Sequence, residues 1–561
     1  MLRVIIMMLS VTFVLCAVAE AKPLVGVYYF PGWYRQGPAD WKKVDGKFVD
    51  WSEWRGAVMK GAIPRPLAGF YDDANPKLWN YYNRWMTSHG IDFIAFDWYY
   101  NDGQDYLEQS LDSGYLGSNP DPNLKFCLHW CNHGGSWWEK PLDQSTDKLL
   151  TMIDMVCDRY FKHPNYLHID GKPVFMIYEH KTISGFGDAK ANLQAMRERA
   201  KQHGVKDLYI VGVYSGVDRS QIVLRRDAGY DAFCAYTYAW MRGPKVAWDS
   251  KTYDYPDITE NVVTNVYPYL ARVARADGIS YWPSSFSGWD DRPRAGLDRA
   301  IVLVDNTPDQ FGKMFKNSLR YVDRKNPVVI IEAWNEWGEG ADMEPSKQYG
   351  FGYLTEIAKA LNIKNPDQSV PTKKEIASWS ILTPEELKIA KENESKPWPV
   401  KPVKHYNMGA NRKVWDVTMP VIINFASGGV EFNMHQIEIE KRDSEGLVFT
   451  TTGTDPQIDF HTPEIPNQQI TRVTVEMEVL ERLSSKRPLS PEIFVATALL
   501  PEFCPFTSIV MPPLTNGVTS QSTSQMMAWS AFGTPIIRMR IDPCEVSGVK
   551  FRLKRMIISG D

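Results

Sequence analysis

The sequence predicts a (β/α)8 TIM barrel followed by a C-terminal antiparallel β-sandwich domain, and three observations support this prediction. From about residue 23 to residue 365, short β-branched or aromatic runs alternate with longer segments of helical period. This pattern is typical of a parallel sheet with crossover helices. The short runs number eight, which fits a closed barrel. Beyond about residue 414, short alternating runs separated by Gly, Pro, Asn and Asp turns indicate a sandwich.

The predicted barrel strands each end in a run of aromatic or polar residues, and they cover residues 24–30, 91–97, 124–129, 173–179, 208–214, 232–236, 279–283 and 328–333. The predicted helices lie between and after them, at residues 76–88, 146–161, 189–203, 220–227, 259–276, 308–324 and 351–361. Pro76 and Pro308 stand at first helical positions, behind capping residues such as Asn75 and Thr307. Capping residues, proline and apolar period therefore agree on where these helices begin.

Composition favours a carbohydrate partner over a nucleic acid. The 561 residues exceed what one hydrophobic core normally organises, so we expect two domains. The 63 basic and 67 acidic residues give a net charge of -4, which gives no reason to expect a polyanionic partner. Aromatic residues make up 13% of the chain, with 20 Trp. Aromatic rings offer flat apolar surfaces on which the C–H faces of sugars can lie.

The N-terminus has the pattern of a secretory signal. Arg3 precedes an apolar run over residues 4–18, and Ala19-Glu20-Ala21 forms an A-x-A cleavage site. We therefore expect residues 1–21 to be a signal peptide and the mature protein to be secreted or periplasmic. No later segment is long and apolar enough to predict a membrane span. Few cysteines follow the signal, although Cys504 and Cys544 could pair.

Three segments follow the predicted signal. Residues 22–365 form the catalytic barrel, residues 366–413 form a Pro- and Lys-rich linker with one helix-like patch at 384–391, and residues 414–561 form the sandwich. The sandwich either binds carbohydrate or buttresses the barrel. The first barrel connection, residues 31–90, is long enough to shape a site and holds Trp33, Trp41, Trp51 and Trp54.

The ends of the predicted strands carry a consistent set of side chains. In a (β/α)8 barrel the active site lies at the C-terminal ends of the strands. Aromatic residues alternate there with carboxylates and polar groups. The aromatic rings can pack on a sugar ring, and the polar groups can bind its hydroxyls. The predicted substrate-binding residues are Tyr28, Tyr29, Trp33, Asp97, Trp98, Tyr99, His129, Trp130, Glu179, Tyr236, Trp289, Asp290, Trp334, Asn335 and Trp337.

Strand eight and its exit give the sharpest prediction, because Glu336 and Glu339 leave a buried strand three residues apart. Glycosidic cleavage needs one carboxylic acid that protonates the leaving oxygen and a second carboxylate near the anomeric centre. Gly338 and Gly340 allow a tight turn and close access for a substrate. The alternative is a purely structural role, in which one acid caps a helix and the other forms an ion pair. We predict that Glu336 and Glu339 are the catalytic carboxylates.

The segment Asn335-Glu336-Trp337-Gly338-Glu339-Gly340, followed by Glu344-Pro345, resembles the signature of WbsX-type proteins, which are related to glycoside hydrolase family 99. Further blocks resemble that group in the same order, at residues 26–33, 90–96, 170–174 and 288–290. The resemblance covers roughly residues 23–362. It implies a (β/α)8 fold and, for family 99, endo-acting cleavage of α-mannosidic linkages with retention.

The resemblance also implies roles for the two carboxylates. Glu336 is similar in place to the family 99 base, which acts on the sugar 2-hydroxyl through an anhydro-sugar intermediate, and Glu339 matches the general acid. Gly338 departs from family 99, which commonly has His there. This departure bears on the mannosidase substrate rather than on the carboxylates. WbsX-type proteins have also been labelled glycosyltransferases, but activated sugar donors are cytoplasmic and the predicted location is not.

Two other functions remain open on sequence grounds. Arg292 and Arg294 beside Asp290 keep a polysaccharide lyase possible, because such an enzyme needs cations for a uronic acid group. A non-catalytic glycan-binding protein on the same scaffold would be expected to lack one of the two acids. His129, His133 and His180 lie on separate strands without tight ligand spacing, so we predict no catalytic metal and no cofactor.

Overall fold

The structure is a computed structural model of the chain. It describes residues 22–34, 42–44, 47–49, 65–133, 141–217, 219–241, 251–394, 396, 398–403, 419–465, 472–482, 489–497, 503, 508–514, 517–522 and 536–559. The predicted signal peptide, Trp41, Trp51, Trp54 and Cys504 lie outside these described residues. Among the described residues, no helix is both long and apolar enough to cross a membrane.

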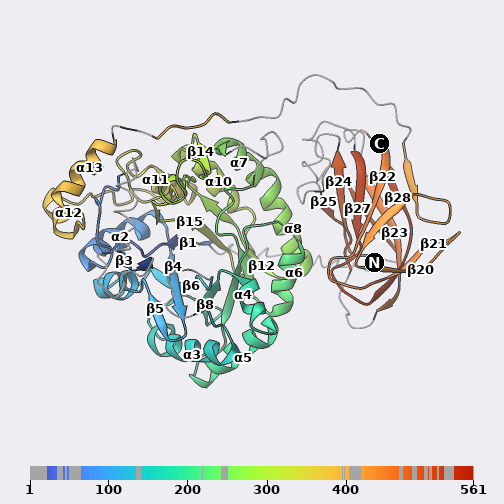
Figure 1. Ribbon diagram of the computed structural model, residues 1–561, viewed down its shortest axis with the longest axis horizontal. Coiled ribbons are helices and arrows are strands. Elements are labelled where there is room, and N and C mark those ends of the chain that lie inside the picture. Colours follow the sequence, from blue (N-terminus) through green and yellow to red (C-terminus); the bar gives the residue numbers. More distant parts are fainter. Residues whose placement is uncertain are drawn as a thin grey trace, which may run out of the picture.

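A parallel sheet of short buried strands forms the barrel (Figure 1). Its order is β12-β10-β9-β8-β6-β4-β1-β15-β13. The strands are β1 (Leu24–Tyr29), β4 (Phe93–Asn101), β6 (Lys125–Trp130), β8 (Lys172–Ile177), β9 (Tyr209–Val213), β10 (Ala232–Cys234), β12 (Ser280–Trp282), β13 (Ser284–Phe286) and β15 (Val328–Glu332). All eight predicted strands are present, with ends that differ by a few residues, so the predicted (β/α)8 fold is confirmed.

The barrel closes through a strand that is interrupted at one residue. β12 pairs with β10, and β13 pairs with β15 on the other side. Only Pro283 separates the two segments, and its carbonyl oxygen accepts a hydrogen bond from the backbone N–H of Ile330. Proline has no N–H to give to a sheet. The segment around Pro283 therefore divides into two short strands that join the two edges.

Helices surround the sheet as a TIM barrel requires (Figure 1). They are α2 (Pro76–His89), α3 (Thr146–Val156), α4 (His180–Gly185), α5 (Ala189–Gln202), α6 (Arg219–Ala228), α7 (Tyr255–Asn261), α8 (Tyr267–Asp277), α9 (Arg292–Ala295), α10 (Pro308–Ser318) and α11 (Gly352–Ala360). π-Helical turns at Cys157–Phe161 and Val262–Val266 continue α3 and join α7 to α8. The predicted helix at 259–276 is thus the end of α7, a π turn and α8, and α10 stops before the predicted residue 324.

The segment after the barrel folds back onto it. It holds α12 (Lys373–Trp379), which was not predicted, and α13 (Pro384–Glu394), which begins where the helix-like patch was expected. The buried Trp379 donates its indole N–H to the carbonyl of Ala68, and Ser380 forms a bridge with Tyr71. This part of the predicted linker therefore packs against the barrel.

The C-terminal region forms two antiparallel sheets, confirming the predicted sandwich. The first contains β18 (Val421–Asn424), β20 (Ile437–Asp443), β21 (Gly446–Thr451), β23 (Arg472–Arg482), β26 (Val518–Ser522) and β28 (Val549–Ser559), and the second contains β19 (Phe432–His435), β22 (Gln457–Ile465), β24 (Glu492–Thr497), β25 (Ser508–Val510) and β27 (Ile536–Asp542). Side chains of both sheets share one hydrophobic core. Cys544, in the loop after β27, is a buried free thiol that donates to the carbonyl of Val546.

The sandwich lies against barrel helices α6 and α8 (Figure 1). Arg219 of α6 binds Asp277 with two hydrogen bonds of 2.9 Å and donates a third to the carbonyl of Ser490 in the sandwich. Tyr269 of α8 donates to Glu492, which is fully buried. Buried polar groups of this kind need partners, so these contacts join the two units.

Candidate active site

A two-stranded hairpin at the C-terminal end of β15 carries the two predicted catalytic carboxylates. Its strands are β16 (Asn335–Glu336) and β17 (Ala341–Asp342), which pair antiparallel. The backbone N–H of Glu339 donates to the carbonyl of Glu336 over 3.0 Å. Gly340 has a φ of 62°, in the left-handed region that favours glycine. The predicted tight turn is therefore present, and it fixes Glu336 and Glu339 on one short loop.

Glu336 is the more buried of the pair, since only 4% of its side chain is exposed. Its Oε1 accepts a hydrogen bond from the hydroxyl of Tyr236 over 3.0 Å, and its Oε2 accepts one from Arg294 Nη2 over 3.0 Å. Burial raises the pKa of Tyr236 well above its usual range, so this phenol stays protonated and can donate. Glu336 is thus held by one neutral and one cationic donor.

Glu339 is the more accessible carboxylate, with 18% of its side chain exposed. Its Oε1 accepts a hydrogen bond of 2.6 Å from Arg294 Nη1. One guanidinium therefore contacts both acids, which means that the two carboxylates face a common volume. Charge-assisted bonds from a planar guanidinium favour the ionised form of both partners.

The absence of a side chain at residue 338 makes room for this arginine. A Cβ on Gly338 would lie 2.8 Å from Arg294 Nε, closer than non-bonded atoms normally approach. Arg294 comes from the short helix α9, and its guanidinium carbon lies 4.9 Å from the ring centre of Phe30. The feature that departs from family 99, Gly338, is thus coupled to an ion pair between α9 and the carboxylate loop.

Aromatic rings from four barrel strands gather around Tyr236, whose hydroxyl contacts Glu336. Tyr28 lies 4.9 Å from His129 and 5.1 Å from Tyr236 between ring centres, and Tyr178 lies 6.0 Å from Tyr236. Tyr28 and His129 are fully buried, whereas Tyr178 and Tyr236 are partly exposed. Tyr178 and Tyr236 are therefore the rings of this group placed to meet a ligand, and Tyr28 and His129 support them from below.

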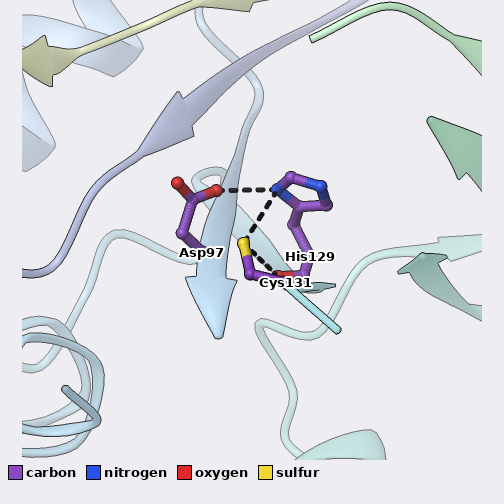
Figure 2. A group of neighbouring side chains, drawn as sticks. All are labelled: Asp97, His129 and Cys131. Carbon is purple, nitrogen blue, oxygen red and sulfur yellow. Dashed lines mark hydrogen bonds and ion pairs between the residues drawn. The ribbon is translucent and has the colours of Figure 1, made fainter. Parts of the chain in front are cut away.

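Asp97 and His129 form a buried pair within the same group (Figure 2). Asp97 Oδ1 lies 2.7 Å from His129 Nδ1, and Cys131 Sγ lies 3.9 Å from the same nitrogen. These three residues are a group whose donor atoms could hold a metal ion. Ligand atoms around one zinc ion stand at about 2.0–2.3 Å from it and more than about 3 Å from one another. The Asp97–His129 separation therefore fits a hydrogen bond better than shared coordination.

Several predicted site residues point away from the barrel interior. Neighbouring residues of a strand face opposite sides, so Tyr29 packs on Trp79 of α2 and donates to Asp73. Asn335 binds the backbone of Phe30 through both amide atoms. Five further predicted residues are fully or almost fully buried, namely Trp33, Trp98, Trp130, Trp334 and Trp337. Direct contact with a substrate by these side chains stays a prediction.

The other predicted residues lie at the rim. Tyr99 is 9% exposed at the end of β4, and Glu179 caps α4 by accepting a hydrogen bond from the backbone of Lys181. Trp289 and Asp290 follow β13 and line a cavity next to the carboxylate loop. The backbone N–H of Asp290 donates to the carbonyl of Glu339 over 2.5 Å. Asp290 therefore supports the carboxylate loop through its backbone, and its binding of a sugar hydroxyl stays a prediction.

Two buried acids near the site have functions that the sequence did not indicate. Glu332 is fully buried at the end of β15, and burial, together with the charges of Glu339 and Glu336, raises its pKa well above its usual range. Glu344, which follows the two carboxylates in the segment that resembles the family signature, accepts hydrogen bonds from Tyr82, Tyr71 and Trp337 over 2.7, 2.8 and 3.1 Å. Glu344 thus anchors the hairpin to α2, a contact with no local signature in sequence.

Because Glu344 is a buried carboxyl, we expect the free energy of unfolding to fall as pH rises. Burial outweighs its three donors and raises its pKa from 4.5 to about 8. A carboxyl with a raised pKa stabilises the fold fully below its unfolded pKa and loses this contribution as pH rises from about 4.5 through about 8. We expect Glu344→Gln to lose part of the decline in unfolding free energy that the native chain shows between these pH values, as measured by urea denaturation. The exposed control Glu392→Gln should retain the native slope, and equal slopes for all three chains would contradict this account.

The comparisons with known proteins agree on the barrel region. The family described as "Glycosyltransferase WbsX" matches residues 31–357. Two curated relatives from strains of Xanthomonas campestris pv. campestris, both described as "Uncharacterized protein WxcX", are 24% identical over 349 residues. This match covers 60% of the chain and 48% of each relative, so the chain spans about half the length of the curated relatives it matches.

Solved structures similar to the chain cover the same share of it. A GH99 endo-alpha-mannosidase from Bacteroides thetaiotaomicron, in complex with Bis-Tris propane, is 20% identical with a TM-score of 0.44 and covers 60% of this chain and 96% of its own. A structure described as "Glycoside hydrolase-like protein" is 19% identical with a TM-score of 0.43 and covers 60% of this chain and 94% of its own.

Proposed function

The chain belongs to the WbsX family, and from this premise we propose that it is a glycoside hydrolase that cleaves a polysaccharide or glycan with retention. The observation that carries the proposal is the pairing of Glu336 and Glu339 on one turn at the C-terminal end of the barrel, bridged by Arg294. Two carboxylates that face one volume are what glycosidic hydrolysis requires, and the resemblance to family 99 favours retention over inversion.

The resemblance to family 99 and the difference in exposure support one division of roles. Glu339, the more accessible acid, protonates the leaving glycosidic oxygen, so that the leaving sugar departs with a new hydroxyl. Glu336, held in place by Tyr236 and Arg294, acts at the anomeric side. It either attacks the anomeric carbon or takes the proton of the 2-hydroxyl, whose oxygen then closes on that carbon. Water attacks the anomeric carbon in the second half and gives its proton to Glu339. In the glycosyl-enzyme route Glu336 then leaves as a carboxylate, and in the anhydro-sugar route it returns its proton to the 2-oxygen.

Arg294 imposes an order on these steps. A general acid must carry its proton before cleavage, yet the ion pair to Arg294 favours the ionised form of Glu339. Binding of a substrate must therefore weaken the contact between Arg294 and Glu339. This requirement ties proton uptake by Glu339 to occupation of the site.

Substrate and location are the finer parts of the proposal. The resemblance of the Glu336–Glu339 segment to family 99 makes endo-acting cleavage of α-mannosidic linkages the first activity to assay, and Gly338 in place of His makes other linkages necessary comparisons. The A-x-A pattern at residues 19–21 supports secretion or export to the periplasm. A polymeric extracellular glycan is the substrate class that such a location would supply.

A reducing-end assay tests the proposed function. The native chain is expected to release new reducing ends from at least one member of a panel of mannans, bacterial polysaccharides and uronic-acid polymers, and Glu339→Gln should largely abolish release. Products with an unsaturated uronic acid would instead establish a lyase. Binding of a glycan without cleavage by either chain would favour a glycan-binding protein.

A further inference from the structure

We propose that the cavity behind the catalytic loop is a second saccharide-binding site, on the leaving-group side of the bond, and that the segment after the barrel supplies part of its wall. This inference rests on the proposed function. The cavity has a volume of about 760 Å³, within the range of ligand pockets. Its aromatic lining includes Trp289, Trp337, Tyr349 and Trp398.

The cavity adjoins the loop that carries the general acid. Trp337, two residues before Glu339, and Gly340, directly after it, both line the cavity, and so does Asp290, whose backbone N–H binds the carbonyl of Glu339. Trp289 packs against Trp240 with 4.8 Å between ring centres. The acid protonates the oxygen that leaves, so sugar units of the leaving group lie on the Glu339 side of the site.

The segment after α13 is fixed over this cavity. Arg292 donates to the backbone carbonyls of Trp398 and Pro399 over 3.3 and 3.1 Å. The guanidinium carbon of Arg292 lies 5.3 Å from the ring centre of Trp398. At the end of α13, Glu394 Oε1 forms an ion pair with Arg65 Nη2 over 2.6 Å. Trp398 is therefore held as a wall of the cavity by contacts with the barrel.

The charges around the cavity favour a neutral ligand. Arg292 binds Asp290 with two ion-paired hydrogen bonds, one of 2.7 Å. Arg65 and Lys347 both face Glu394, over 2.6 and 4.0 Å. Cations and acids thus largely neutralise one another, which suits the hydroxyls of an uncharged sugar better than a polyanion.

One donor in the wall lacks a partner. The indole N–H of Trp289 is buried and makes no hydrogen bond among the described residues. Trp289 itself is only 6% exposed. Buried polar groups are normally satisfied, and a sugar oxygen in the cavity would accept this bond. Aromatic faces together with a small number of placed donors are the chemistry by which proteins bind neutral saccharides.

The test measures binding without cleavage, using full-length chains that carry Glu339→Gln. Probes are neutral oligosaccharides from mannan, glucan, galactan and xylan, graded from disaccharide to hexasaccharide, with calorimetry as the readout. Trp398→Ala should weaken binding of the longer ligands about threefold to tenfold, the loss expected for one aromatic contact. The loss of affinity should be smaller for disaccharides. Trp398→Phe should restore most of the affinity. As a control, Val370→Ala at an exposed position should leave the affinity unchanged.

Two results would overturn the proposal. One is equal affinity of the Trp398→Ala and parent chains for every oligosaccharide that binds. The other is a lack of binding by all the neutral oligosaccharides. If the native chain still releases reducing ends from an acidic polymer in that case, the hydrolase function stands and only the neutral second site fails.

Discussion

Glu339→Gln is expected to lower kcat/KM on a natural glycan by about 10²–10⁴-fold, the usual contribution of a general acid. The same variant should lose much less activity on an aryl glycoside of the same sugar, because a phenolate leaves without needing a proton. Steady-state kinetics on the two substrates measures the difference. This contrast is specific to the residue that protonates the leaving group.

Glu336→Gln is the matched comparison for Glu339→Gln, since it removes the same charge from the same loop. Glu336 acts on the anomeric side, so its loss should reduce turnover of the glycan and of the aryl glycoside to a similar extent. Two results would contradict these roles. One is an equal loss of activity on both substrates in Glu339→Gln, and the other is retained activity on the aryl glycoside in Glu336→Gln.

Arg294→Met is expected to lower kcat/KM by about tenfold to a hundredfold and to move the acidic limb of its pH profile to higher pH. The arginine contacts Glu336 and Glu339 over 3.0 and 2.6 Å, and a neighbouring cation favours ionised carboxylates. Without it the carboxylates take up protons at higher pH, so the ionised base is lost earlier on acidification. Because 29% of the arginine side chain is exposed, solvent screening reduces the size of this displacement.

Arg299→Met is the control for Arg294→Met, because Arg299 follows α9 on the same loop and is exposed. Its profile should match that of the native chain. An unchanged acidic limb in Arg294→Met would mean that the guanidinium does not govern protonation of the pair. Gly338→Ala provides independent support, since its Cβ would press on Arg294 and should displace the limb in the same direction.

The barrel could be predicted because each strand carries its own signal. A run such as 328–331 is apolar along its whole length, as expected for a strand buried on both faces. The division of strand seven at Pro283 was not predicted, because it depends on which neighbours each half meets. The π turns at Cys157–Phe161 and Val262–Val266 likewise lie inside segments whose apolar period reads as continuous helix.

The site could be predicted only in part, for a related reason. Strand ends locate a side chain at one edge of the barrel, which placed Glu336, Tyr236 and Asp97 in one region. The position of a strand end does not determine which ring faces inward. Tyr29 was therefore predicted as a substrate-binding residue, although it packs on α2. Arg294 lies on a four-residue helix within a loop, where no period indicates direction. Arg294 was predicted only as a cation of the alternative lyase, whereas the structure places it between the two acids.

The measurement that tests the central claim most directly is the reducing-end assay run in heavy-oxygen water, with products identified by mass spectrometry. If Glu336 and Glu339 hydrolyse a glycosidic bond, each new reducing end produced by the native chain carries one heavy oxygen, and Glu339→Gln yields almost none. Products without heavy oxygen would contradict hydrolysis. An accompanying unsaturated sugar would then identify elimination, and transfer to another sugar would identify a transferase.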